Sequence, residues 1–107
     1  MLSERFRVYI DVHFSGENVE GIGIVYNLAL RGALIETKTP VKTGDRLDLS
    51  VMLPDQDDPV ELPAAVRWVR GHRMGVEFFK MEVEAFQQLT GYLIGVLNAN
   101  QKHLKAA

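Results

Sequence analysis

Arginine side chains occur at two places in this chain where they could bind an anion. Arg5 and Arg7 open the first stretch of alternating apolar residues, and Arg31 lies in residues 27–32, between two apolar runs. A guanidinium presents a planar fork to a phosphate or to the edge of a guanine base, and its charge does not titrate away. Asn27 can both donate to and accept from a base edge. These residue types are compatible with a site for a compact dianion, but their spacing alone fits solvated surface arginines as well.

Gly32 ends the segment of residues 27–32 and indicates that the backbone there is exposed. A glycine permits positive φ, or it lets a ligand lie close against the main chain. The simpler interpretation of residues 27–32 is a hairpin loop that begins with an Asn-initiated turn. Both interpretations place this segment between two strands.

The sequence offers little for catalysis or metal binding. Its three histidines, His13, His72 and His103, are far apart and have no carboxylate at metal-ligand spacing, and there is no cysteine. No serine has the context of a nucleophile elbow, and no glycine-rich loop precedes a helix. The acidic residues 54–59 lack the ligand spacing of a calcium loop, so we expect a solvated turn there. We therefore predict that the protein is not an enzyme and holds no metal or cofactor.

Length and composition predict one soluble domain over residues 1–107. The chain is 47% hydrophobic and 24% charged, with a formal net charge of −2. These values are ordinary for a globular protein, and the weak negative charge argues against nucleic acid as a partner. No apolar stretch approaches the length of a membrane span, so we expect a cytoplasmic protein without membrane insertion.

Alternating apolar residues predict six β-strands. They are expected at residues 6–14, 19–26, 32–36, 47–53, 60–69 and 74–78. Gly21 and Gly23 suggest a bulge or strong bend, and Pro63 suggests a sheet edge or a bulge. Six strands with short turns predict a mainly β fold, an antiparallel meander or Greek-key barrel over about residues 5–79.

After Lys80 the apolar period changes to three or four residues, which predicts a C-terminal α-helix over about residues 82–104. Tyr92, Ile94 and Val96 widen its apolar surface, and Gly91 and Gly95 would let a neighbour approach closely. The helix could simply plug one end of the barrel. It could also bind a protein partner or a second copy of the chain, in which case part of this surface would be exposed in the monomer.

Three segments resemble the PilZ domain family. Residues 25–36 read VYNLALRGALIE, residues 65–70 read AVRWVR and residues 74–79 read MGVEFF. The resemblance covers nearly the whole chain in the right order. It implies a six-stranded antiparallel PilZ-type barrel with a C-terminal helix, and a bacterial protein. Many PilZ domains are receptors for the second messenger cyclic di-GMP.

The resemblance also implies roles for single residues. Asn27 and Gly32 match the family loop, Asn or Asp-x-Ser-x-x-Gly, but Ala29 stands at the serine position. The family arm has two arginines separated by three residues; Arg7 matches the second, while Ser3 stands at the first. The list of implied ligand-binding residues is Arg5, Arg7, Asn27, Ala29, Arg31, Gly32 and Trp68, where Arg5 is two residues out of register and Trp68 could stack on guanine or line the barrel.

The resemblance leaves two functions open. One is a stand-alone receptor or adaptor that binds cyclic di-GMP. The other is a degenerate PilZ adaptor that binds no nucleotide and works through a motility or secretion protein.

Restoring the family residues provides a first test. Ser3→Arg adds a charge-assisted contact worth about 1.5–3 kcal/mol, and Ala29→Ser adds one hydrogen bond worth about 1 kcal/mol. Together they should tighten cyclic di-GMP binding by roughly two to three decades, measured by calorimetry. A folded double variant that still binds no nucleotide would contradict the receptor hypothesis.

Overall fold

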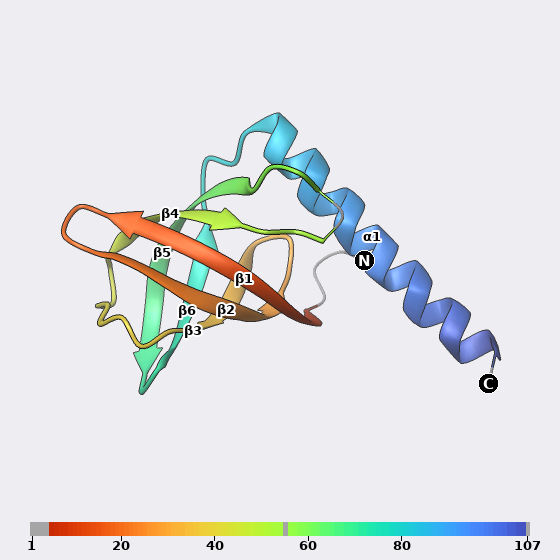
Figure 1. Ribbon diagram of the computed structural model, residues 1–107, viewed down its shortest axis with the longest axis horizontal. Coiled ribbons are helices and arrows are strands. Elements are labelled where there is room, and N and C mark those ends of the chain that lie inside the picture. Colours follow the sequence, from red (N-terminus) through yellow and green to blue (C-terminus); the bar gives the residue numbers. More distant parts are fainter. Residues whose placement is uncertain (1–4, 55, 107) are drawn as a thin grey trace.

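The chain folds into a closed barrel of six antiparallel strands followed by one long helix (Figure 1), as expected from the sequence. This computed structural model describes residues 5–54 and 56–106. The elements are β1 (Phe6–Gly16), β2 (Glu20–Leu28), β3 (Gly32–Glu36), β4 (Arg46–Val51), β5 (Val60–Arg70), β6 (Arg73–Phe78) and α1 (Val83–Ala106). Around the barrel the order is β1-β2-β3-β6-β5-β4, so two three-stranded meanders join through β3–β6 and β1–β4.

Alternation along the strands fills the barrel with apolar side chains. In β1, Phe6, Ile10, Val12 and Phe14 are buried, while Arg7 between them is exposed. Burying one such side chain contributes about 1.5–3 kcal/mol relative to leaving it in water. The inner rows therefore hold the strand register, and this register decides which residues face outward.

The loop predicted at residues 27–32 is shorter than expected. Asn27 and Leu28 belong to β2 and Gly32 begins β3, so only residues 29–31 connect the strands. The prediction was wrong because Leu28 is fully buried and pairs with Phe6, which extends the ladder past the end of the apolar run. The Ala29 amide donates to the Gly32 carbonyl at 2.9 Å and closes the tight hairpin.

The bulge expected at Gly21 and Gly23 is also absent, because the β1–β2 register is regular from Ile10 to Ser15. The glycines instead allow close packing between strands. A Cβ at Gly23 would lie 2.5 Å from the Glu36 carbonyl oxygen. Within the described ladders, the register changes lie between Arg7 and Ile10, Val25 and Asn27, and Val66 and Trp68.

Pro63 does not mark a sheet edge, since β5 is paired on both sides. It lies opposite Asp48 of β4 and one residue before the first β5–β6 pair, Ala64 with Phe78. Its carbonyl accepts from the Phe79 amide at 3.0 Å on the β6 side. The proline nitrogen, which lacks a hydrogen, therefore lies just beyond the end of the β5–β6 ladder. No hydrogen bond of that ladder is lost.

Helix α1 packs its first half against the barrel and then extends away from it (Figure 1). Ala85, Leu89 and Leu93 join the barrel core. Of the three residues predicted to widen its apolar surface, Ile94 is 44% exposed, whereas Tyr92 and Val96 are partly buried against the core. Phe86, on the same helix, is also 44% exposed. Whether a partner covers these exposed side chains stays a prediction. No helix in the described part of the chain is long and apolar enough to cross a membrane.

Two glycine-to-alanine substitutions should have opposite effects on stability. Gly23→Ala forces a methyl group against backbone and should lower the free energy of unfolding by about 1–3 kcal/mol. Gly91→Ala meets nothing within 4 Å and should raise it by about 0.8–1 kcal/mol through helix propensity. Urea titration of both variants measures these differences, and a Gly23→Ala protein as stable as the wild type would contradict the close strand packing.

Candidate functional site

One row of directly opposed residues crosses five strands on the outer face of the barrel. Arg7 lies opposite Asn27, Asn27 opposite Leu34, Leu34 opposite Gly75, and Gly75 opposite Trp68. Directly opposed residues in antiparallel strands point to the same face. The ladder therefore brings together Arg7, Asn27 and Trp68, which lie 20 or more positions apart in the sequence.

Two bulges turn the side chains of this row outward. In β5, Val66 is buried, but the next two residues, Arg67 and Trp68, are both exposed because one extra residue sits between Val66 and Trp68 in the ladder. In β2, Tyr26 and Asn27 likewise follow each other on the outside between buried Val25 and Leu28. Bulges re-aim side chains in this way at many binding sites.

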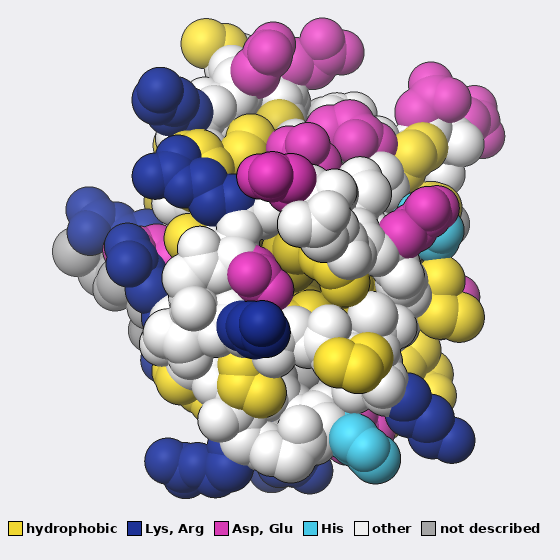
Figure 2. Space-filling view, turned by 90° about the vertical axis from the view of Figure 1, so that its left-hand side faces the viewer, with side chains coloured by type: hydrophobic (Ala, Val, Ile, Leu, Met, Phe, Trp, Pro, Cys, Tyr) yellow, Lys and Arg dark blue, Asp and Glu magenta, His cyan; other side chains and the backbone are white. Residues whose placement is uncertain are grey.

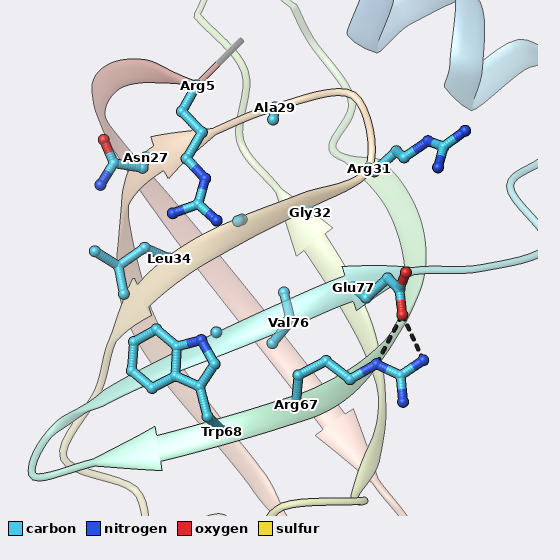
Figure 3. A pocket seen from close by; sticks show the side chains of 12 residues that line it. Arg5, Asn27, Ala29, Arg31, Gly32, Leu34, Arg67, Trp68, Val76 and Glu77 are labelled. Carbon is cyan, nitrogen blue, oxygen red and sulfur yellow. Dashed lines mark hydrogen bonds and ion pairs between the residues drawn. The ribbon is translucent and has the colours of Figure 1, made fainter. Parts of the chain in front are cut away.

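A shallow hollow of about 390 Å³ covers the middle of the row (Figure 3). Its lining residues are Arg5, Asn27, Ala29, Arg31, Gly32, Ala33, Leu34, Arg67, Trp68, Gly75, Val76 and Glu77. Six of the seven residues implied by the sequence line it. Arg7 does not; it is exposed on the outer face, across the ladder from Asn27. Ser3, the other position of the family arm, lies outside the described residues.

Trp68 forms one end of the hollow. It is 42% exposed and is the only tryptophan in the chain. Its indole lies over Gly75, where an added Cβ would stand 2.9 Å from Cδ1 and closer still to Nε1. The Arg70 guanidinium carbon lies 5.9 Å from the ring centroid. The indole thus lies outside the barrel rather than lining its interior, and it offers an aromatic surface at the hollow.

Two further arginines, Arg5 and Arg31, line the hollow. The Arg5 guanidinium lies over β3, and Arg31 projects from the β2–β3 loop (Figure 3). Among the residues that the structure describes, neither arginine forms an ion pair. Their charges are therefore available to an anion. Seen from the left-hand side of Figure 1, acidic side chains gather in the upper part of the molecule, and basic ones lie along the left side and the lower edge (Figure 2).

The hollow also contains an ion pair that the sequence analysis did not identify. Arg67 Nε donates to Glu77 Oε1 at 2.7 Å. Glu77 pairs with Ala65 in the β5–β6 ladder, and Arg67 lies two residues further along β5. The side chains of Glu77 and Arg67 are therefore diagonal neighbours on the outer face. Glu77 occupies an outward position of the predicted strand at residues 74–78, but only the strand register shows its partner.

Gly32 and Ala29 both line the hollow, and the structure gives a packing reason for the glycine. A Cβ at Gly32 would clash with the Val76 carbonyl oxygen, and Gly32 is not among the described residues with positive φ. The glycine is thus explained by the close approach of β3 and β6. Ala29 lines the hollow with a methyl group and offers no hydroxyl.

A second outward group lies beside the row. The Tyr26 hydroxyl donates to Glu36 Oε1 at 3.4 Å, and its ring meets that of Tyr9 edge-on at 5.5 Å. Loss of solvent contact, together with the Glu36 carboxylate, raises the pKa of Tyr26 above its ordinary value. A phenol is neutral at physiological pH even at its ordinary pKa, so the shift does not change the charge of this group.

The site has the chemistry of ligand binding. No histidine lines the hollow, and no group of three or more potential metal ligands occurs among the described residues. It combines free guanidinium groups, an amide, an aromatic ring and one ion-paired carboxylate. These groups suit an anion that also carries a planar ring.

The family is decided by the sequence profile, since residues 2–95 match that of the PilZ domain. The chain belongs to the PilZ domain family. No curated protein sequence matches it significantly.

Solved PilZ structures share this fold. The PilZ domain of CeSA from a cellulose-synthesizing bacterium has a TM-score of 0.73 at 16% identity, over 88% of this chain and 98% of that one. The PilZ domain of Escherichia coli YcgR, determined with cyclic di-GMP, has a TM-score of 0.72 at 14% identity, over 97% of this chain and 96% of that one. The Bacillus subtilis inhibitor of motility MotI has a TM-score of 0.75 at 22% identity, over 89% of this chain and 50% of its own length.

The contact between Trp68 and Gly75 can be tested by fluorescence. Gly75→Ala places a methyl group where the indole now lies, so the ring must move toward solvent, at a stability cost of about 1–3 kcal/mol. We expect a red-shifted emission and stronger quenching by acrylamide than in the wild type. Gly91→Ala serves as the control and should leave the emission unchanged; unchanged emission in Gly75→Ala would contradict the placement of Trp68.

Proposed function

We propose that this PilZ domain is a receptor or adaptor that binds cyclic di-GMP on the outer face of β2, β3, β6 and β5. The observation that carries the proposal is the row from Arg7 to Trp68, with Arg5 and Arg31 beside it. We further propose that the protein acts in the bacterial cytoplasm, in second-messenger control of motility, biofilm or secretion, without catalysis.

The charges favour the two phosphates of this ligand. Arg5, Arg7 and Arg31 form no ion pair among the described residues, so binding does not require an existing pair to break. A hydrogen bond to a charged group contributes about 1.5–3 kcal/mol. Because the site is open to solvent, salt should screen these contacts effectively.

The indole favours the bases. Stacking a base on an aromatic side chain contributes about 1–3 kcal/mol. Trp68 lies on the same outward row as Asn27, whose amide can both donate to and accept from a base edge. The cyclic di-GMP present in the YcgR structure supports the same ligand type for this chain, at the level of the family.

The departures from the family motif weaken the proposed site without removing its chemistry. Ala29 loses one hydroxyl contact, worth about 1 kcal/mol. The arginine expected at position 3 is the larger loss, but the Arg5 guanidinium reaches the hollow from two residues further along the chain. We therefore propose that Arg5 replaces that contact.

The alternative function is an adaptor that binds a protein or a second copy through α1. The exposed Phe86 and Ile94 favour it, because apolar side chains on a helix that extends from the barrel are available to a partner. In this alternative the hollow would bind no nucleotide.

Calorimetric titration with cyclic di-GMP distinguishes the two functions. The wild type should bind, and binding should weaken as salt is raised. Arg5→Ala should weaken it roughly 10- to 100-fold by removing a charge-assisted contact. Trp68→Ala should weaken it about 5- to 150-fold through lost stacking.

Lys42→Ala is the matched control for charge, because Lys42 is exposed in the β3–β4 connection and lies outside the hollow. It should bind like the wild type. Equal weakening in Lys42→Ala and Arg5→Ala would indicate non-specific attraction, and the absence of heat with the wild type would overturn the receptor function.

A further inference from the structure

Glu77 is the only carboxylate among the described residues that line the hollow. A site that merely attracted phosphates would be weakened by it, because a negative charge repels an anionic ligand. Arg67 offsets this charge, since its Nε donates to Glu77 Oε1 at 2.7 Å and its Nη2 contacts the same oxygen. The ion pair therefore keeps an anionic hydrogen-bond acceptor in a hollow whose other charged lining residues, among those described, are arginines.

One oxygen of this carboxylate remains open. Both Arg67 contacts reach Oε1, while Oε2 has no hydrogen-bond partner among the described residues and points away from Arg67 (Figure 3). The neighbours of Glu77 across the ladder are Gly32 on β3 and Ala65 on β5, both too small to cover it. The Glu77 side chain is 48% exposed. A ligand can therefore approach Oε2 directly.

Glu77 and the aromatic surface line the same hollow. Glu77 lies two residues along β6 from Gly75, which is beneath the Trp68 indole, and two residues of a strand span about 7 Å. The Glu77 carboxylate lies on the side of Gly75 away from the indole (Figure 3). A ligand that fills the hollow would therefore meet both the aromatic ring and the carboxylate.

We propose that Glu77 determines the base specificity of this site, accepting hydrogen bonds from the N1–H and 2-amino groups of guanine. An ionised carboxylate only accepts hydrogen bonds, and guanine places these two donors side by side. Adenine has one donor on this edge, its 6-amino group, next to an acceptor at N1 that the carboxylate repels, so it would form at most one hydrogen bond with Glu77. This inference rests on the proposed function and adds to it a residue that selects guanine over adenine dinucleotides.

The experiment compares the dissociation constants for cyclic di-GMP and cyclic di-AMP, measured by calorimetry. In the wild type we expect a preference for the guanine ligand of about 5- to 150-fold, as a bidentate contact to a base supplies. Glu77→Gln should remove most of this preference by weakening cyclic di-GMP alone. Cyclic di-IMP, which has N1–H but no 2-amino group, should bind the wild type with intermediate affinity.

Two variants separate the carboxylate from the ion pair. Arg67→Gln removes the pair but keeps Glu77, and it should weaken both dinucleotides while retaining the guanine preference. Glu36→Gln is the matched control, because Glu36 also faces outward beside an arginine, Arg73 at 3.6 Å, but lies outside the hollow. It should change neither affinity.

The outcomes distinguish a failure of the proposed function from a failure of the role of Glu77. A wild type that binds neither dinucleotide overturns the proposed function and this inference with it. A wild type that prefers cyclic di-GMP, with the same preference in Glu77→Gln, overturns only the role of Glu77. Equal loss of preference in Arg67→Gln and Glu77→Gln assigns the effect to the ion pair and also overturns it.

Discussion

The whole site depends on the ladder that closes the barrel. Buried side chains such as Phe14, Ile35 and Leu49 fix the register of the strands, because a slip by one residue would expose them to water. The same register places Arg7, Asn27 and Trp68 in one row on the outer face. A site assembled from five strands thus requires no stabilising contacts of its own; the apolar interior holds its geometry.

Bulges give this closed barrel its binding surface. A strictly alternating β5 would have turned either Arg67 or Trp68 inward, and the extra residue between Val66 and Trp68 keeps both outside. The ion pair and the aromatic ring can therefore lie next to each other. Two glycines also shape the binding surface, since Gly75 leaves room for the indole and Gly32 lets β3 approach β6.

Alternation and helical periodicity were sufficient to predict the six strands and the helix, because each strand buries one face against a single core. The positions of the bulges could not be predicted, because a bulge depends on pairing with distant strands. The sequence suggested a bulge or strong bend at Gly21 and Gly23 and a sheet edge or bulge at Pro63, whereas the register shifts of these strands lie at Tyr26 and Arg67. Six of the twelve residues that line the hollow were implied by the family resemblance, because each lies in or beside a short motif that can be recognised within its own segment. The pairing of Glu77 with Arg67 joins two strands, and only the register brings them together.

We propose that a dinucleotide binds across the row on the outer face of the barrel. Amide chemical-shift changes during titration with cyclic di-GMP test this binding site residue by residue. We expect the largest changes at Arg7, Asn27, Leu34, Gly75 and Trp68, with helix α1 unaffected. Changes confined to α1, or none at saturating ligand, would contradict it.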